Sequence, residues 1–201
     1  ADRQALDGYV AKLERTDISR FDRPEQLAYW INLYNALTVK VVLEHYPVAS
    51  IRDIDISPGL FSSGPWGKKL AGVEGEMLSL DDIEHRILRP IWGDARIHYA
   101  VNCASVGCPD LLPRAYTPAD MDAVLDANAR AYINSPRGVK IDGGDIEASS
   151  IYDWFAEDFG GNDEGIIRHL LLYAAGETKT ALEKAKGIDG YFYDWSLNGV
   201  E

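Results

Sequence analysis

Basic residues are scarce in this chain of 201 residues: 20 lysines and arginines stand against 32 aspartates and glutamates, for a net charge of −12. No cluster of basic residues offsets this excess locally. Such a chain is repelled by the phosphates of nucleic acids and by anionic membrane surfaces. We therefore expect no nucleic-acid partner, and instead a small-molecule, peptide or protein partner.

Long apolar runs and the common catalytic motifs are also missing. No apolar run approaches the ~20 residues of a membrane-spanning helix. The chain contains no G-x-x-x-x-G-K-[ST], G-x-G-x-x-G, H-E-x-x-H or G-x-S-x-G pattern, so the nucleotide-binding, zinc-protease and serine-hydrolase classes have no motif support. We expect no cofactor and no resident metal.

What is present suits one globular domain. Hydrophobic residues make up 46% of the chain and charged residues 26%, which is enough to bury a core. No repeat or linker divides the sequence, so we expect one domain over residues 1–201. The fold class predicted is α+β: helix-dominant, with a small antiparallel sheet built from hairpins. Helices are predicted over residues 4–13, 26–45, 79–88, 117–133, 150–159, 164–174 and 179–186; hairpins over 69–78 and 139–148; and strands over 96–102 and 191–197.

The predicted helix 26–45 is apolar on nearly every face, which predicts a buried helix. Asn32 and Asn35 lie three residues apart on it and share a face. Buried amides need hydrogen-bond partners. The simpler interpretation is that they hold loop backbone, for example near Cys103. The sharper one is that an asparagine orients a catalytic histidine, as in papain-like sites.

Both cysteines lie in one segment, from Asn102 to Pro109. Cys103 adjoins the small residues Ala104 and Ser105, whose neighbourhood offers space and backbone N–H groups for an oxyanion. Three chemistries are open: a thiolate nucleophile at Cys103, a Cys103–Cys108 disulfide, or inert or metal-bound thiols. The spacing is not C-x2-C, so the metal alternative is weak.

A nucleophilic cysteine needs a base. His98 is near in sequence, but a strand would point it away from Cys103, so His85 on the preceding helix is a rival. Glu84 is placed to orient either imidazole. Asn102 and Ser105 complete the set of candidate substrate-binding or orienting residues.

Several blocks together resemble the family called domain of unknown function 547. They are Tyr29–Leu37, Ser79–His85, Arg96–Ala100, Asn102–Ser105 with Cys108-Pro109, Trp154–Gly160 and Tyr193–Asn198. The resemblance implies a periplasmic or extracellular setting, because bacterial members often carry export signals, and a natural protein that begins before Ala1 as a longer exported precursor. Plant relatives with interaction segments keep a non-enzymatic role open.

Two main hypotheses follow. The first is a cysteine-dependent hydrolase or acyl transferase, papain- or transglutaminase-like in logic, acting on an amide or thioester. The second is an exported binding or scaffold module with oxidised cysteines, in which the aromatic C-terminal strand forms part of a partner surface. A thiol–disulfide oxidoreductase is a weaker third, since redox motifs usually space their cysteines as C-x-x-C.

Overall fold

The computed structural model describes residues 2–59 and 63–199, and it is organised around one long helix, α2 (Arg23–His45). Asp22 caps this helix: its carboxylate accepts a hydrogen bond from the Glu25 N–H at 2.9 Å, and the Glu25 carboxylate accepts one from the Asp22 N–H at 3.1 Å. This reciprocal pair satisfies two backbone donors at the helix start. Most of α2 is buried, as its apolar surface on all sides predicts.

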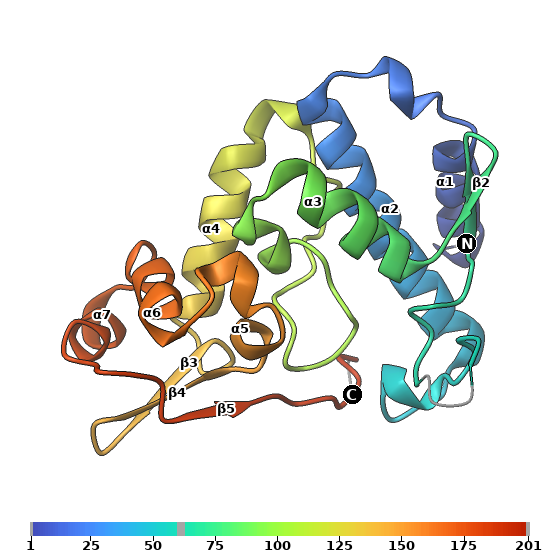
Figure 1. Cartoon of the computed structure of the whole chain (residues 1–201). Helices are drawn as coiled ribbons and strands as arrows, with labels where there is room; N and C mark the ends of the chain where they lie inside the picture. Colours follow the sequence, from blue (N-terminus) through green and yellow to red (C-terminus); the bar gives the residue numbers. More distant parts are fainter. Residues whose placement is uncertain (1, 60–62, 200–201) are drawn as a thin grey trace.

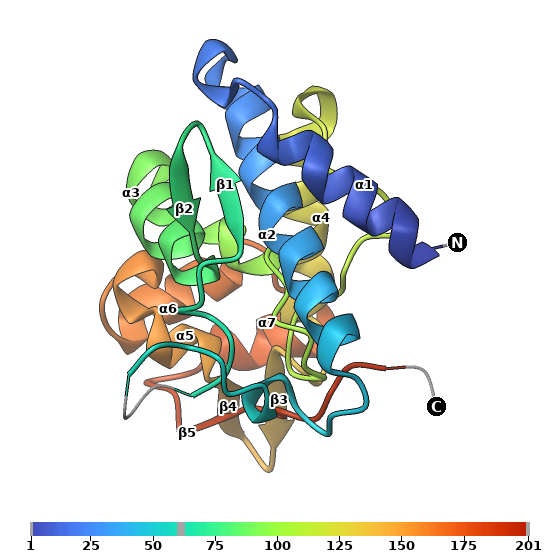
Figure 2. The same cartoon turned by 90° about the vertical axis from the view of Figure 1, so that its right-hand side faces the viewer.

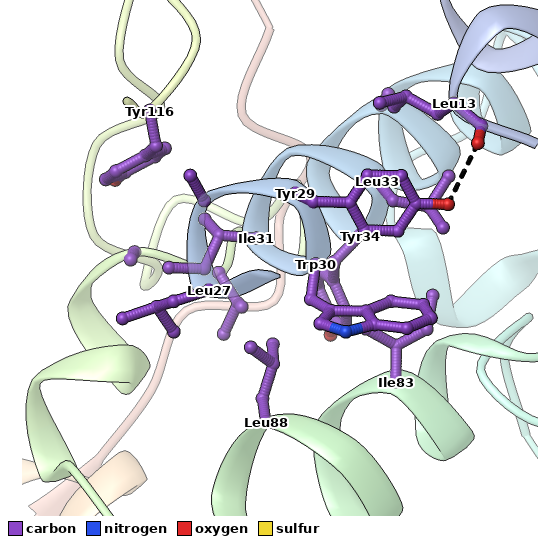
Figure 3. Close-up of a cluster of buried hydrophobic side chains, with 14 of the residues drawn as sticks. Leu13, Leu27, Tyr29, Trp30, Ile31, Leu33, Tyr34, Ile83, Leu88 and Tyr116 are labelled. Carbon is purple, nitrogen blue, oxygen red and sulfur yellow. Dashed lines mark hydrogen bonds between the residues drawn. The ribbon is translucent and has the colours of Figure 1, made fainter. Parts of the chain in front are cut away.

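The N-terminal half of the chain packs around α2 (Figures 1 and 2). Helix α1 (Asp2–Glu14) lies against α2, and the Tyr29 hydroxyl donates to the Leu13 carbonyl at 3.0 Å (Figure 3). The antiparallel hairpin of β1 (Ala71–Val73) and β2 (Glu76–Leu78) covers α1 and α2 from the side. Short 3-10 helices, η1 (Ile18–Arg20) and η2 (Ile51–Asp53), join these parts.

A helical segment that carries candidate site residues follows the hairpin. It comprises the π-helical η3 (Asp82–Leu88) and α3 (Arg89–Trp92). Ser79 caps its start, because its hydroxyl accepts from the Asp82 N–H at 3.1 Å while the Asp82 carboxylate accepts from the Ser79 N–H at 2.8 Å. Ile83 and Leu88 from this segment pack into the core beneath α2 (Figure 3).

The C-terminal half forms a second core around a three-stranded sheet (Figure 1). Strands β3 (Val139–Asp142) and β4 (Asp145–Ser149) form the predicted hairpin, and β5 (Gly190–Phe192) adds to β4 in parallel. The accompanying helices are η4 (Ala95–Tyr99), η5 (Pro118–Asp120), α4 (Met121–Ile133), α5 (Ile151–Trp154), η6 (Ala156–Phe159), α6 (Asp163–Leu171) and α7 (Gly176–Leu182).

The α+β class with dominant helix is confirmed, with corrections in detail. The segment 96–102 is no strand: Asp94 accepts from the Arg96 N–H at 2.9 Å and starts the 3-10 helix η4. The last strand is shorter than predicted, and because β5 runs parallel to β4 the larger sheet is mixed rather than purely antiparallel. The predicted helix 150–159 is divided into α5 and η6.

Within residues 2–59 and 63–199, no helix combines the length and the apolar character that crossing a bilayer requires.

The burial of α2 gives a stability prediction with an internal control. Leu33 is fully buried, whereas Leu43 on the same helix is 42% exposed. Leu33→Ala removes core contacts and leaves a cavity, so we expect it to lower the free energy of unfolding by about 2–5 kcal/mol. Leu43→Ala is expected to change it by less than ~0.5 kcal/mol. Urea unfolding measures both, and equal losses would contradict a core centred on α2.

Candidate functional site

A cavity of about 210 Å³ lies between the two halves of the chain, and aromatic rings make up much of its wall. The rings come from α2, the loop before β1, α5 and the segment after β5. They belong to Tyr34, Trp66, Trp154, Phe155, Tyr193 and Trp195. A concave, mostly apolar site with a few polar groups is the usual form of a small-molecule site.

The C-terminal aromatic residues pack together as one group. The rings of Trp154 and Trp195 are stacked with centroids 5.3 Å apart, and Tyr193 packs against them at 4.8 Å and 4.7 Å. Trp66 meets Trp195 edge to face at 5.8 Å. These offset and edge-to-face arrangements are those that aromatic quadrupoles favour. Residues about 130 positions apart in sequence thus form one continuous wall.

The two cysteines also line the cavity, joined as a Cys103–Cys108 disulfide. Their Cα atoms are 6.3 Å apart, within the usual range for a disulfide. The Tyr193 hydroxyl lies 3.0 Å from Cys103 Sγ and 3.2 Å from Cys108 Sγ, and 2.8 Å from the Ser105 hydroxyl. In this oxidised form neither sulfur is a thiolate, so the site holds no cysteine nucleophile.

The C-terminal segment holds the disulfide loop in place. The N–H groups of Val106 and Gly107 donate to the carbonyls of Ser196 and Asp194, each at 2.8 Å. A Cβ on Gly107 would lie 2.9 Å from the Tyr193 ring and 3.0 Å from the Asp194 backbone. Only glycine permits this close approach of the two segments.

The backbone N–H groups that we expected to bind an oxyanion already have partners. The Ala104 N–H donates to the Asn102 side chain at 2.7 Å, and the Cys103 N–H donates to Cys108 Sγ at 3.0 Å. In this conformation these two N–H groups are not free, preorganised donors, and an oxyanion site formed by other N–H groups near Ala104 stays a prediction.

His98 lies on the cavity wall between two carboxylates. Its Nε2 is 2.6 Å from Asp158 Oδ2, and its Nδ1 is 3.7 Å from Glu84 Oε1. The His98 ring stacks on Phe155 at 4.2 Å. Arg89 Nε donates to the same Asp158 oxygen at 2.6 Å. Because η4 turns the chain, His98 and Cys103 border the same cavity, which a strand over 96–102 would have prevented.

The pKa of Asp158 is lowered by its partners. Burial alone would raise it, but the hydrogen bonds from His98 and Arg89, and the charges of both, outweigh that effect. Asp158 is therefore ionised at neutral pH and fixes the His98 ring through Nε2. Glu84 accepts a hydrogen bond from the Tyr34 hydroxyl at 3.0 Å, so it too is held in place.

His85, the rival base, borders the same cavity, but its ring is more exposed than that of His98 and has other partners. Its Nδ1 lies 3.1 Å from Arg89 Nη1, and its Nε2 lies 3.9 Å from Asp81. The structure brings His85, His98, Glu84 and Cys103 to one cavity. His98 is the histidine that a carboxylate orients at close range.

Of the four other candidate residues, three hold backbone with their side chains, whereas Ser105 contacts other side chains. Asn35 donates to the Ala100 carbonyl and accepts from the Asn102 N–H, both at 2.8 Å. Asn32 makes the equivalent pair with the Tyr116 backbone at 2.9 Å and 2.8 Å. The Asn102 side chain donates to the Pro109 carbonyl at 2.7 Å.

Ser105, the last of the four, is fully buried beside Tyr193. The simpler interpretation of Asn32 and Asn35, as anchors for loop backbone, thus describes the observed contacts. The hydrogen bonds of the four side chains lie within the protein, and the substrate-binding or orienting roles predicted for them stay predictions.

Sequence reasoning missed Asp158 and the aromatic wall. Asp158 lies 60 residues after His98, within the predicted helix 150–159, and nothing in that helix pattern points to the histidine. Trp154 belongs to the same predicted helix and Trp195 to the predicted strand 191–197, and neither pattern predicts a cavity wall. The available signal was the high density of aromatic residues in 154–159 and 191–195. The sequence does not show, however, which faces of these side chains remain exposed to a cavity after folding.

Among the described residues, no group of three or more histidine, cysteine or acidic side chains has the arrangement of a metal site. The four possible ligands Cys103, Cys108, His98 and His85 border one cavity, but the two sulfurs are bonded to each other. Metal ligation requires a deprotonated thiol, so the residues as they stand do not fit a sulfur-ligated metal.

A family model described as "Protein of unknown function, DUF547" matches residues 18–133. This match spans more than half of the chain, so the protein belongs to the DUF547 family. It includes α2, η3, η4 and the disulfide loop, whereas Asp158 and the aromatic residues after it lie beyond the matched region. No curated protein sequence and no solved structure matches the chain significantly.

The lowered pKa of Asp158 predicts a pH-dependent contribution to stability. A carboxyl whose folded-state pKa is below its unfolded value of about 3.9 stabilises the fold fully above that value and loses this effect as the pH falls. We expect Asp158→Asn to destabilise the protein at pH 5, and the gap from the wild type to narrow steadily toward pH 2.5. Urea unfolding across this range measures it, with Asp142→Asn as a control at an exposed position. A gap that stays constant across the range would contradict the assignment.

Proposed function

We propose that this protein is a binding module whose aromatic cavity takes a small organic ligand, with the Cys103–Cys108 disulfide as part of the wall. The observation that carries the proposal is the cavity itself: about 210 Å³, bordered by six aromatic residues from distant segments, and closed by a loop whose polar groups are satisfied internally. This is the architecture of a preformed ligand site. Covalent catalysis at Cys103 would need an activated thiolate, which the disulfide does not supply.

The disulfide also supports a proposal about location. Disulfides persist in oxidising compartments and are rare in the cytosol. A periplasmic or extracellular setting therefore fits a loop held by Cys103–Cys108. In that setting the bond is a permanent part of the cavity wall, and the C-terminal aromatic segment presents its rings to a ligand.

Binding of a neutral aromatic probe tests the proposal. Benzyl alcohol is expected to shift the indole N–H signals of the cavity tryptophans in a saturable titration followed by NMR. Trp154 is 46% exposed, so Trp154→Ala removes one ring of the wall while leaving the cores intact. We expect it to weaken binding about tenfold. Leu172→Ala, at a 64% exposed position, is the matched control. A titration without saturable shifts would reject the binding module.

A second candidate function is a cysteine hydrolase or acyl transferase that works only after reduction of the disulfide. The observation in its favour is the His98–Asp158 pair, which borders the same cavity as Cys103. A dithiol would first reduce the bond and become a disulfide itself. The Cys103 thiol would then transfer its proton to His98, and its sulfur would attack the carbonyl carbon of an amide or thioester, with Asp158 holding the imidazole. His98 would return the proton to the leaving amine or thiol as its bond to the carbonyl carbon breaks, and water would release the acyl group from Cys103.

Thiol chemistry separates the two functions. Both functions predict that the native protein lacks about two hydrogens by intact mass and resists iodoacetamide, so the test begins after mild reduction, where the binding module predicts no fast labelling of Cys103. The hydrolase predicts that, after mild reduction, Cys103 is alkylated at neutral pH much faster than Cys108. It also predicts that Cys103→Ala loses this fast labelling, that Cys108→Ser keeps it, and that His98→Gln slows it. Equal, slow labelling of both cysteines would exclude the hydrolase.

A further inference from the structure

Carboxylates border the cavity, and no lysine or arginine is among the described residues of its wall. Asp81 and Glu84 lie three positions apart on the same helical segment and both face the cavity. Arg89 lies outside the wall, where it is bound to Asp158 and lies 3.1 Å from the ring of His85. Within the wall itself, the only basic side chains beside the two carboxylates are those of His85 and His98.

The titration behaviour of Asp81 agrees with an excess of negative charge. Burial raises the pKa of Asp81, and the charges of Glu84 and Asp82 raise it further, while His85 opposes them. One carboxylate oxygen of Glu84 accepts a hydrogen bond from the Tyr34 hydroxyl. The other oxygen lies 3.7 Å from His98 Nδ1, beyond hydrogen-bond distance. Both carboxylates thus retain capacity for a positively charged partner.

Two rings of the same wall already carry cations. The Arg52 guanidinium lies 5.3 Å from the centre of the Trp195 ring, and Arg89 lies 5.0 Å from that of Phe155. Neither arginine borders the cavity. Aromatic faces attract cations through the ring quadrupole, and tryptophan does so most strongly. Trp154, stacked on Trp195 and 46% exposed, adds a further ring surface to the same wall.

We infer that the ligand of this cavity is a small organic cation, a substituted ammonium with an apolar shell. The inference rests on the proposed binding function and names its ligand class. The methyl or methylene groups of such a cation contact the aromatic wall, while its charge is balanced by Asp81 and Glu84. An anion of the same shape meets the two carboxylates at short range and is rejected, because like charges placed together in a partly buried site repel strongly.

Three probes of nearly equal shape test the charge preference. They are choline, the neutral 3,3-dimethylbutan-1-ol and the anion 3,3-dimethylbutanoate. Titrations of the oxidised protein, followed by NMR at the tryptophan indole signals, give the dissociation constants. We expect choline to bind about tenfold more tightly than the alcohol, and the carboxylate to give no saturable shift.

Two variants assign the preference to the wall. Asp81→Asn keeps the shape of a half-exposed side chain and removes its charge, so choline binding is expected to weaken about three- to tenfold while alcohol binding is unchanged. Asp142→Asn, on the distant β3–β4 hairpin, removes the same charge and is expected to alter neither. Unchanged choline affinity in Asp81→Asn would overturn the role of this carboxylate.

The outcomes separate this inference from the binding function itself. Equal affinity for choline and the alcohol, or tighter binding of the carboxylate, overturns the cation inference and leaves the binding module standing. The cation inference is also overturned, and the binding module kept, if benzyl alcohol binds saturably while none of the three probes binds. If benzyl alcohol and all three probes fail to bind, both proposals fall.

Discussion

The amide of Asn35 is the contact on which the arrangement of the site depends. It donates to the Ala100 carbonyl and accepts from the Asn102 N–H, so one buried side chain takes the place of a strand partner for the chain at the start of the disulfide loop. A buried backbone donor or acceptor left without a partner costs about 1–3 kcal/mol. The long and largely buried helix α2 therefore fixes where the loop begins.

The loop is held from three further directions. Tyr132 of α4 donates to the Gly107 carbonyl at 2.7 Å, and Arg137 donates to the Cys108 carbonyl at 3.0 Å. On the remaining side the C-terminal segment pairs with Val106 and Gly107. Asn35 belongs to the N-terminal half, and these three anchors belong to the C-terminal half. The loop therefore joins the two halves of the molecule, and the cavity lies along that junction. A ligand in the cavity would contact both halves and stabilise their association by mass action.

The parts of the fold that local sequence controls were predictable. The helix after Asp22, the hairpins at 69–78 and 139–148 and the cap at Ser79 depend on periodicity, turn residues and short-range hydrogen bonds, and all of them form. The segment 96–102 shows the limit. Its alternation of apolar residues predicts a strand, but Asp94 binds both the backbone and the side chain of Arg96 and bends the chain into a 3-10 helix. A local side-chain hydrogen bond thus outweighs a short periodic pattern.

The composition of the site was less accessible than the fold. Single polar residues on apolar elements led to His98, Glu84 and Cys103, which do border one cavity. Asp158 was not found, because its proximity to His98 arises only when η6 packs against η4, 60 residues apart in sequence. The aromatic residues present the same difficulty. A tryptophan such as Trp154 packs with one face and remains uncovered on the other, and no sequence pattern distinguishes such a ring from one that is wholly enclosed.

Because Trp154 is only partly covered, part of the apolar cavity wall stays in contact with water, next to acidic side chains. Asp81 is half exposed and keeps this edge of the cavity hydrated, whereas Glu84 is buried. The aromatic rings supply apolar area and a negative electrostatic face. The two features act on a ligand in the same direction, since both favour a positive charge that carries apolar groups. The net charge of −12 by itself speaks only to solubility and repulsion; in the inferred binding mode, two of its carboxylates would act locally because they line the same cavity as the stacked tryptophans.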